Sequence, residues 1–195
     1  MVKYVWRFQV QSVNERPRGK KPPKNYTDSF PASSEQIAQE LILKPIGLVH
    51  STFKERYAAP RQPALAEKSE EQITASIELF EGFNFNQALK DLDQFSHIWV
   101  IYWMHLNQGW NPTVMPPRGP KTKRGVLATR APHRPNSIGL SAVKLLGVQG
   151  RTLEIASHDM LDGTPVLDIK PYLPYADSII DASHGWLENT DLIPS

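Results

Sequence analysis

HIWVIYWM, residues 97–104, is the most apolar run in the sequence, and it decides the fold. Its residues are mostly aromatic or β-branched, which is typical of a strand, and it predicts a central strand buried on both faces. Shorter runs of similar character lie before and after it. They predict strands over residues 2–10, 41–49, 75–80, 125–129, 138–148, 152–157 and 164–169.

Turns rather than helices connect these runs. Gly150 marks a hairpin-type turn, and one short helix is expected over residues 86–93, with Asn86 as its N-cap. Strands that do not alternate with helices argue against a doubly wound sheet. We therefore predict an all-β fold, a closed or nearly closed β-barrel of about seven strands with short helical insertions.

The first 40 residues differ in composition from the rest of the chain. After the strand over 2–10, residues 14–34 are polar and dense in Pro and Lys, which indicates a linker or mobile arm. A solvated linker explains this basic run more simply than a nucleic-acid-binding arm. We expect an N-terminal strand and arm over 1–40, a barrel domain over 41–180 and a polar tail over 181–195.

Composition excludes several classes of protein. Of 195 residues, 40% are hydrophobic and 22% charged, which is ordinary for a soluble globular chain. The absence of cysteine excludes disulfides and thiolate metal ligands, and the six histidines form no recognised metal pair, so no metal site is expected. Neither a signal peptide nor a membrane span is predicted, which makes the cytoplasm the default location.

Charge is unevenly distributed although the formal net charge is only +2. No Asp or Glu occurs between Asp93 and Glu154. A uniformly positive segment favours an anionic partner such as phosphate, carboxylate or nucleic acid, although a solvated basic loop is an alternative. The basic residues in this window are Arg118, Lys121, Lys123, Arg124, Arg130, Arg134, Lys144 and Arg151.

RGVLATRAPHRPNSIG, residues 124–139, lies inside this window. The strand expected over 125–129 breaks into a turn that contains Arg130 and Arg134. Two prolines stiffen the turn, and a rigid loop with fixed guanidinium groups is well suited to hold an anion. A purely structural loop is equally compatible with these residues.

Two further loops stand out, PRQP at 60–63 and DMLDGTP at 159–165. The first holds an Arg and an amide between prolines, and the second holds two carboxylates before a Gly turn, which by itself indicates a β-turn. Together with the Arg130 loop they could bind a zwitterion, with guanidinium groups for its carboxylate or phosphate and carboxylates for its cationic group. The usual nucleotide-binding and hydrolase motifs do not occur.

Five separated motifs, in order, resemble the TsaA-like family, which includes the TrmO-type tRNA methyltransferases. The resemblance implies a single-sheeted β-barrel that uses S-adenosylmethionine to methylate N(6)-threonylcarbamoyladenosine beside the tRNA anticodon, and a homodimer. The motifs are PRQP at 60–63, FSHIW at 95–99, MPPR at 115–118, RGVLATRAPHRPNSIGLS at 124–141 and DMLDGTPVLDIKPYLPYADS at 159–178.

The resemblance also implies site residues. Leu106 departs from the pattern of bacterial members, which often have Gln there, and it offers only packing or backbone contact. The implied cofactor residues are Pro60, Arg61, Gln62, His105, Leu106, Arg130, Leu140, Asp159, Met160, Leu161 and Asp162.

The acceptor implied by the resemblance is a urea-type nitrogen, which is a poor nucleophile while it keeps its proton, so a positioned base would help. The candidates are Asp159, Asp162 and His133, and we expect Arg118, Lys123, Arg124 and Arg134 to contact the tRNA. Two alternatives stay open at this point. One is a module that binds S-adenosylmethionine or RNA without transfer, and the other is a small-molecule methyltransferase.

Overall fold

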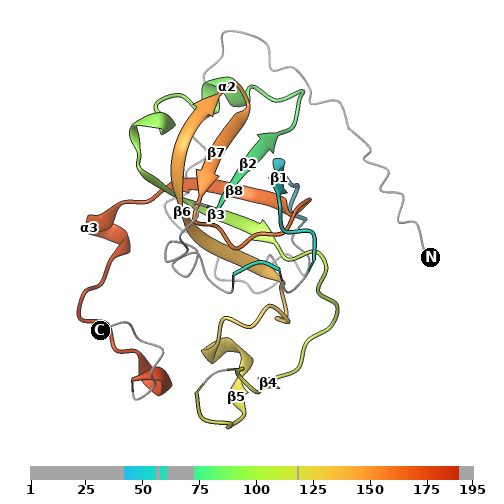
Figure 1. The fold of residues 1–195 in the computed structure, drawn as a ribbon, viewed down its shortest axis with the longest axis vertical. Coiled ribbons are helices and arrows are strands. Elements are labelled where there is room, and N and C mark those ends of the chain that lie inside the picture. The colour runs from blue at the N-terminus through green and yellow to red at the C-terminus, as the bar shows by residue number, and fades with distance from the viewer. Residues whose placement is uncertain (1–41, 56–57, 61–72, 118, 189–195) are drawn as a thin grey trace, which may run out of the picture. The chain divides into compact units, whose positions relative to one another are not determined.

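The computed structural model describes residues 42–55, 58–60, 73–117 and 119–188, and the expected strand over 2–10 and the arm over 14–34 lie outside them. In the described part of the chain, six strands close into a barrel (Figure 1). This confirms the predicted all-β barrel. The barrel strands are β1 Gly47–Ser51, β2 Thr74–Leu79, β3 His97–Trp103, β6 Ile138–Gln149, β7 Thr152–Ala156 and β8 Pro165–Pro171.

The barrel order is β1-β2-β7-β6-β3-β8, and every neighbouring pair is antiparallel. Pairing of β1 with β8 closes the barrel, with Gly47 opposite Val166. The strand expected over 41–49 begins only at Gly47, since Pro45 has no N–H to donate to a ladder, and it continues to Ser51.

Strand direction decides which loops meet. In this antiparallel order the C-terminal ends of β1, β3 and β7 lie at the same end of the barrel as the N-terminal ends of β2, β6 and β8. We call this the loop end, defined by the connections over residues 52–73, 104–137 and 157–164. The opposite end carries the β6–β7 turn, where Gly150 has a φ of 60° and confirms the predicted hairpin.

The interior of the barrel is apolar, and β3 supplies its Ile98, Val100 and Tyr102 side chains. The expectation that β3 is buried on both faces is wrong, because its burial alternates and Trp103 on the outer face is exposed. A closed barrel has one inner face, so burial alternates with a period of two residues even in a strand that is almost entirely apolar. Each fully buried aliphatic side chain contributes about 1.5–3 kcal/mol to folding. The core also contains Val49, Ile77, Leu79, Val143, Leu153, Ile155, Met160 and Val166.

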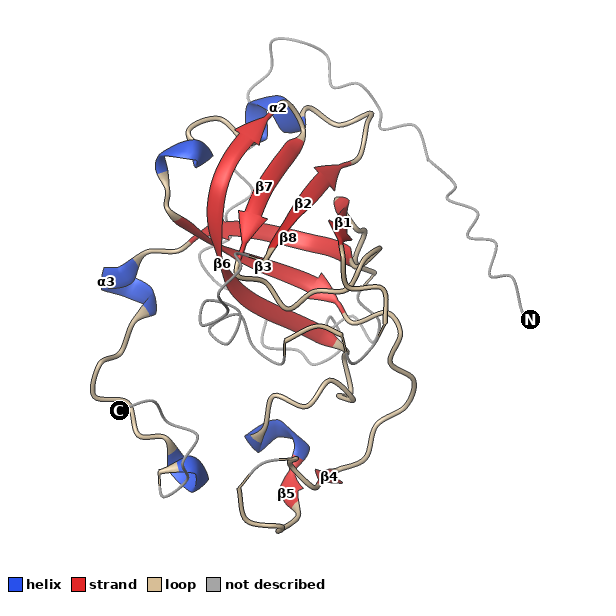
Figure 2. Cartoon of the chain, in the orientation of Figure 1, coloured by secondary structure: helices blue, strands red, loops and turns tan. Residues whose placement is uncertain are grey.

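Helical structure is confined to short pieces (Figure 2). The single helix expected over 86–93 is instead α2 Phe85–Ala88 and the 3-10 helix η2 Leu92–Gln94, because Asp91 between them adopts a left-handed φ of 66°. The N-cap of α2 is Asn84, not Asn86. Two more short helices follow the barrel, α3 Pro174–Asp177 and the 3-10 helix η4 Gly185–Leu187. Every helix among the described residues is too short or too polar to cross a bilayer.

The connection from β3 to β6 contains a small sheet of its own, in which β4 Thr113–Val114 pairs with β5 Arg124–Gly125. The strand expected over 125–129 is wrong beyond Gly125, because Val126–Ala128 forms the 3-10 helix η3. The chain turns here because the Val126 carbonyl accepts from the Thr129 Oγ1 hydroxyl at 2.8 Å, which competes with a strand ladder.

Candidate functional site at the loop end of the barrel

The predicted cofactor residues come from segments far apart in the sequence, and strand direction brings the described ones to the loop end. Pro60 lies between β1 and β2, the pair His105–Leu106 follows β3, and Arg130 precedes β6. Asp159–Asp162 connects β7 to β8. Leu140 is the third residue of β6 and therefore close to the same end. Arg61, Gln62 and Arg118 lie outside the described residues.

Asp159 is the most buried carboxyl group of this set, and the hydroxyl of Ser141 donates a hydrogen bond of 2.6 Å to its Oδ1. Burial raises the pKa of Asp159, and the hydrogen bond from Ser141 and the positive charge of Arg130 oppose that rise. The carboxyl group is therefore a stronger base than an exposed aspartate. It also lies close enough to Arg130 to feel its charge.

The two arginines of the 124–139 loop have different places. Arg134 is half-buried, and its Nη1 donates to the carbonyl oxygens of Thr129 at 2.7 Å and Val126 at 3.3 Å. It thus fixes the turn that carries Arg130. Arg130 itself is exposed. The structure therefore separates a guanidinium that holds the loop from one that is presented at the loop end.

Asp162 is tied to the end of β1. Its Oδ1 accepts from the Ser51 backbone N–H at 2.9 Å, and its Oδ2 accepts from Lys54 Nζ at 2.5 Å. The hydrogen bond from Lys54 is the first cause that lowers the pKa of Asp162, followed by the bond from Ser51. A carboxylate held in this way is a weak base, and it anchors the 159–164 loop to β1.

Between these two carboxylates the chain turns inward. Met160 is buried in the core, and its backbone N–H donates to His158 Nδ1 at 3.3 Å. His158 is fully buried against Phe53, with ring centroids 5.2 Å apart, and burial lowers its pKa. The loop is anchored from inside by His158 and Met160, so the polar positions next to them are held in place.

The loop end also presents apolar side chains to solvent. Trp103 and Ile138 face each other across the β3–β6 ladder, and Leu140 lies on the same outer face. Leu106 and Leu140 are 56% and 58% exposed. His105, beside Leu106, is half-buried, and burial lowers its pKa. This outer strip, Trp103, Leu106, Ile138 and Leu140, is an unusual amount of exposed apolar surface for adjacent strands.

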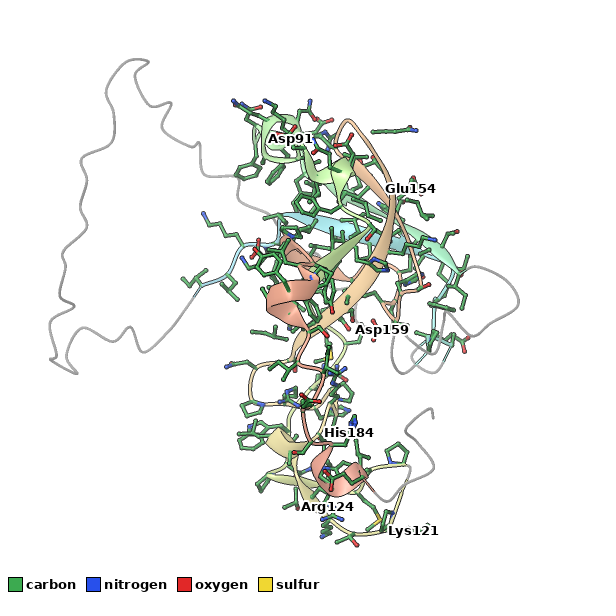
Figure 3. The ribbon with its side chains drawn as sticks, turned by 90° about the vertical axis from the view of Figure 1, so that its left-hand side faces the viewer. Asp91, Lys121, Arg124, Glu154, Asp159 and His184 are labelled. Atoms are coloured by element: carbon green, nitrogen blue, oxygen red, sulfur yellow. The ribbon has the colours of Figure 1, made fainter. Side chains whose placement is uncertain are left out.

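The basic segment extends away from the acidic residues. Figure 3 shows Lys121 and Arg124 at one extreme of the view, Asp91 and Glu154 at the other, and Asp159 between them. The Arg124 guanidinium lies over the Trp186 ring at 5.2 Å, and Trp186 Nε1 donates to the Ala128 carbonyl at 2.9 Å. The segment that includes η4 therefore supports the basic loop. Lys121 and Lys123 are exposed, and His133 is half-buried.

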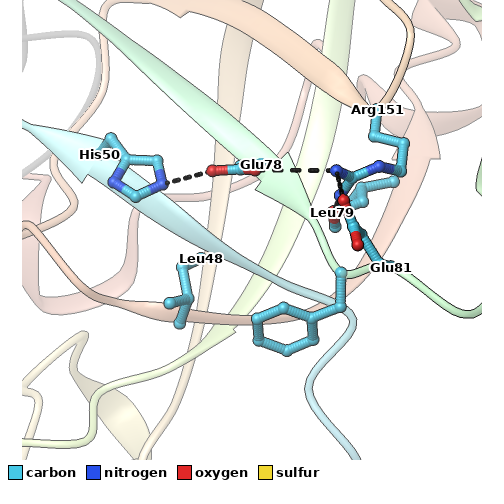
Figure 4. A pocket seen from close by; sticks show the side chains of 7 residues that line it. Leu48, His50, Glu78, Leu79, Glu81 and Arg151 are labelled. Atoms are coloured by element: carbon cyan, nitrogen blue, oxygen red, sulfur yellow. Dashed lines mark hydrogen bonds and ion pairs between the residues drawn. The ribbon is translucent and has the colours of Figure 1, made fainter.

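A shallow pocket is lined by Leu48, Phe80 and a cluster of polar and charged side chains (Figure 4). His50 Nε2 lies 3.2 Å from Glu78 Oε2, and Arg151 Nη2 lies 2.9 Å from Glu81 Oε1. These charges are paired with each other, which indicates a surface ion-pair cluster rather than a ligand site. In the described segments no three His, Asp or Glu residues are grouped as a metal site would require.

Residue-by-residue reading of the sequence missed three contributors, Tyr102, Ser141 and Lys54. Tyr102 and Ser141 sit in apolar strands, and the only signal for them is a polar side chain at an inward position of the period-2 pattern, which needs a buried partner. Lys54 lies in a loop 108 residues from its partner Asp162, and no local pattern predicts that pair.

Comparison with known proteins gives relatives over most of the barrel. The family described as tRNA-methyltransferase O N-terminal domain matches residues 48–178. A putative S-adenosylmethionine-dependent methyltransferase RcsF of Pseudomonas aeruginosa PAO1 is 46% identical over 146 residues, which cover 73% of this chain and 62% of the relative. A tRNA (adenine(37)-N6)-methyltransferase of Escherichia coli K12 is 42% identical over 151 residues, which cover 74% of this chain and 63% of the relative.

The fold agrees with that comparison. The crystal structure of TrmO from Pseudomonas aeruginosa superposes with a TM-score of 0.64 at 41% sequence identity, covering 77% of this chain and 64% of that one. The chain thus spans less than two thirds of the length of these relatives, and the shared part is the barrel and its loops.

Proposed function

The chain belongs to the tRNA-methyltransferase O N-terminal domain family, and we propose that it acts as an S-adenosylmethionine-dependent tRNA methyltransferase. The proposed acceptor is the N6 nitrogen of threonylcarbamoyladenosine next to the anticodon. The observation that carries the proposal is the meeting, at one end of the barrel, of the half-buried Asp159 carboxyl group and the exposed Arg130 guanidinium beside a basic segment. The names of the relatives support the same reaction class.

The residues present fit the proposed cofactor in charge and polarity. S-adenosylmethionine carries an ammonium and a sulfonium group, a carboxylate and an adenine ring. In the proposal Asp159 faces a cationic group, Arg130 binds the carboxylate, and Leu106 and Leu140 supply apolar surface for the ring. Pro60, Arg61, Gln62 and His105 complete the cofactor set that the family resemblance implies.

Of the candidate bases, Asp159 fits the role best. When bound, S-adenosylmethionine supplies a methyl group whose S–C bond breaks as the acceptor nitrogen forms the new N–C bond. The proton of that nitrogen must leave to a base, and a carboxyl group whose pKa is raised by burial accepts a proton more readily than one held as Asp162 is. Asp162 then keeps the loop in place, and His133 is the remaining candidate.

Incubation of the protein with methyl-labelled S-adenosylmethionine and tRNA that contains threonylcarbamoyladenosine tests the function. Label in that nucleoside is expected, and tRNA without the threonylcarbamoyl group is the control and should stay unlabelled. Binding of S-adenosylmethionine without transfer would favour the binding-module alternative. Transfer only to a small acceptor would favour a small-molecule methyltransferase. The tRNA substrate also places the protein in the cytoplasm in this proposal.

Lys123→Ala is expected to weaken tRNA binding and to reduce the slope of log Kd against log salt by roughly one, because a lysine on a phosphate releases one counterion. Lys123 is exposed in the acid-free segment. Lys90→Ala, an exposed lysine in the turn after α2, is the matched control and should keep the wild-type slope. Equal slopes in both variants and the wild type would remove the segment around Lys123 from the tRNA footprint.

We also propose that the protein is a homodimer in which the partner covers Trp103 and Ile138, the part of the outer strip that the proposed cofactor contacts leave exposed. A second copy is an apt partner because Trp103 and Ile138 are exposed apolar side chains and lie beside Leu106 and Leu140 of the proposed cofactor set. Ile138→Lys is expected to give a monomer in gel filtration with light scattering. Leu146→Lys, at a comparably exposed position further along β6, should leave the dimer intact. A wild-type protein that is monomeric at high concentration would contradict the dimer.

A further inference from the structure

Gly139 and Tyr102 lie directly opposite each other in the β3–β6 ladder, and both are buried. The Tyr102 ring lies over the Cα of Gly139, so that a Cβ added at position 139 would overlap the ring atoms, including Cζ. Only glycine, which has no Cβ, leaves room at position 139 for the Tyr102 ring. The pairing therefore directs the tyrosine hydroxyl along the inside of the barrel, toward the next inward-facing residue of β6.

That residue is Ser141. Its Oγ lies 3.3 Å from the Tyr102 hydroxyl oxygen and donates to Asp159 Oδ1 at 2.6 Å. The residues Tyr102 and Ser141 are 8% and 2% exposed. Two hydroxyl groups inside an apolar barrel destabilise the fold unless they are hydrogen-bonded. Here Tyr102 contacts Ser141, and Ser141 donates to the carboxyl group of Asp159 at the loop end.

The surroundings of Asp159 add one further charge. Among the described residues, the ionisable groups that act on its carboxyl group are Tyr102 from β3 and Arg130 from the loop before β6. Burial raises the pKa of Tyr102, so its hydroxyl keeps its proton at neutral pH. Tyr102 and Ser141 are thus neutral hydrogen-bonding groups on the barrel side of Asp159, and Arg130 is the cationic group acting on it.

We infer that Tyr102 and Ser141 are positioning residues that hold the Asp159 carboxyl group in one orientation toward the cationic group of the bound methyl donor. The inference rests on the proposed function for the identity of that ligand. The contacts themselves do not, because the hydrogen bond from Ser141 to Asp159 exists without any ligand. A carboxyl group that is already oriented loses less side-chain entropy when the ligand binds.

The test measures the titration of Asp159 and the affinity for the ligand in separate experiments. In Ser141→Ala, loss of the donor disfavours the charged form, so the carboxyl carbon of Asp159 should titrate at higher pH in NMR spectra of the protein without ligand. The Kd for S-adenosylmethionine, measured by calorimetry, should rise up to about tenfold near neutral pH, because a carboxyl group that is no longer held by Ser141 must be ordered when the ligand binds. Tyr102→Phe keeps the ring over Gly139 and should shift both quantities in the same direction by a smaller amount.

Ser141→Thr restores the hydroxyl and should return both quantities toward the wild type. Ser76→Ala, a half-buried serine of β2, is the matched control and should change neither. If Asp159 titrates identically in Ser141→Ala, Tyr102→Phe and the wild type, the inference is wrong whatever the ligand is. If the titration moves but the Kd does not, Asp159 is not positioned for this ligand. A wild type that binds no S-adenosylmethionine overturns the proposed function, while the titration still decides the contact.

Discussion

Arg130→Ala is expected to raise the Kd for S-adenosylmethionine about 10- to 100-fold, which corresponds to the loss of charge-assisted hydrogen bonds to a carboxylate. Arg130 is exposed at the loop end, its charge acts on Asp159, and Arg134 already fixes the turn around it. Removing the guanidinium should therefore remove a ligand contact without unfolding the loop. Isothermal calorimetry at constant ionic strength measures the effect.

Two variants separate a ligand contact from a general loss of positive charge. Lys144→Ala removes an exposed cation from β6 and should leave the Kd unchanged. Arg134→Ala should act differently, because the carbonyl oxygens of Val126 and Thr129 lose their donor. Its main effect should be faster amide hydrogen exchange in the turn. An Arg130→Ala protein with wild-type affinity would take Arg130 out of the cofactor site.

Gly47→Ala is expected to have the largest effect on stability. Gly47 pairs with Leu79 of β2 and with Val166 of β8, so it lies where the barrel closes. A Cβ there would overlap the Glu78 carbonyl oxygen and lie 2.9 Å from Leu79 Cα. Backbone atoms held in two ladders cannot move aside as a flexible side chain would. We expect a loss of about 3 kcal/mol.

For a protein of this size that loss lowers the melting temperature by roughly 6–12 °C, which thermal unfolding followed by circular dichroism detects. Gly147→Ala is the matched control on β6, because no described atom lies within 4 Å of its added Cβ. Its melting temperature should stay at the wild-type value or rise slightly, since alanine restricts the unfolded chain. Equal melting temperatures for the two variants would show that closure at Gly47 tolerates a side chain.

Much of the fold was predictable because strand signals are local. The runs at 75–80, 97–104, 138–148 and 152–157 appear as strands within one or two residues of their expected bounds. Buried and exposed side chains alternate along a strand with a period of two residues, and this pattern occurs in any sheet that has one buried face. The error at Val126–Ala128 falls where side-chain hydrogen bonds decide, because Thr129 and Arg134 donate to the Val126 carbonyl.

The candidate site was predictable as a set of loops but not as an arrangement. The resemblance to the family supplied Arg130 and the 159–162 carboxylates, and the structure shows that strand direction brings their loops to one end of the barrel. The assignment of a role to each stays a prediction. Tyr102 and Ser141 were absent from the expected set because their importance depends on a partner on another strand.

By itself the sequence determined most of the barrel strands, the acid-free segment and the family, because each is a property of neighbouring residues or of ordered motifs. Only the tertiary structure distinguished the environment of Arg130 from that of Arg134, and the environment of Asp159 from that of Asp162. The physical reason is the same in both cases. Carbonyl oxygens of its own turn hold Arg134, and Lys54 holds Asp162. The pKa of Asp159 is instead raised by burial next to side chains of β3 and β6. Those environments arise only when distant strands close into a barrel.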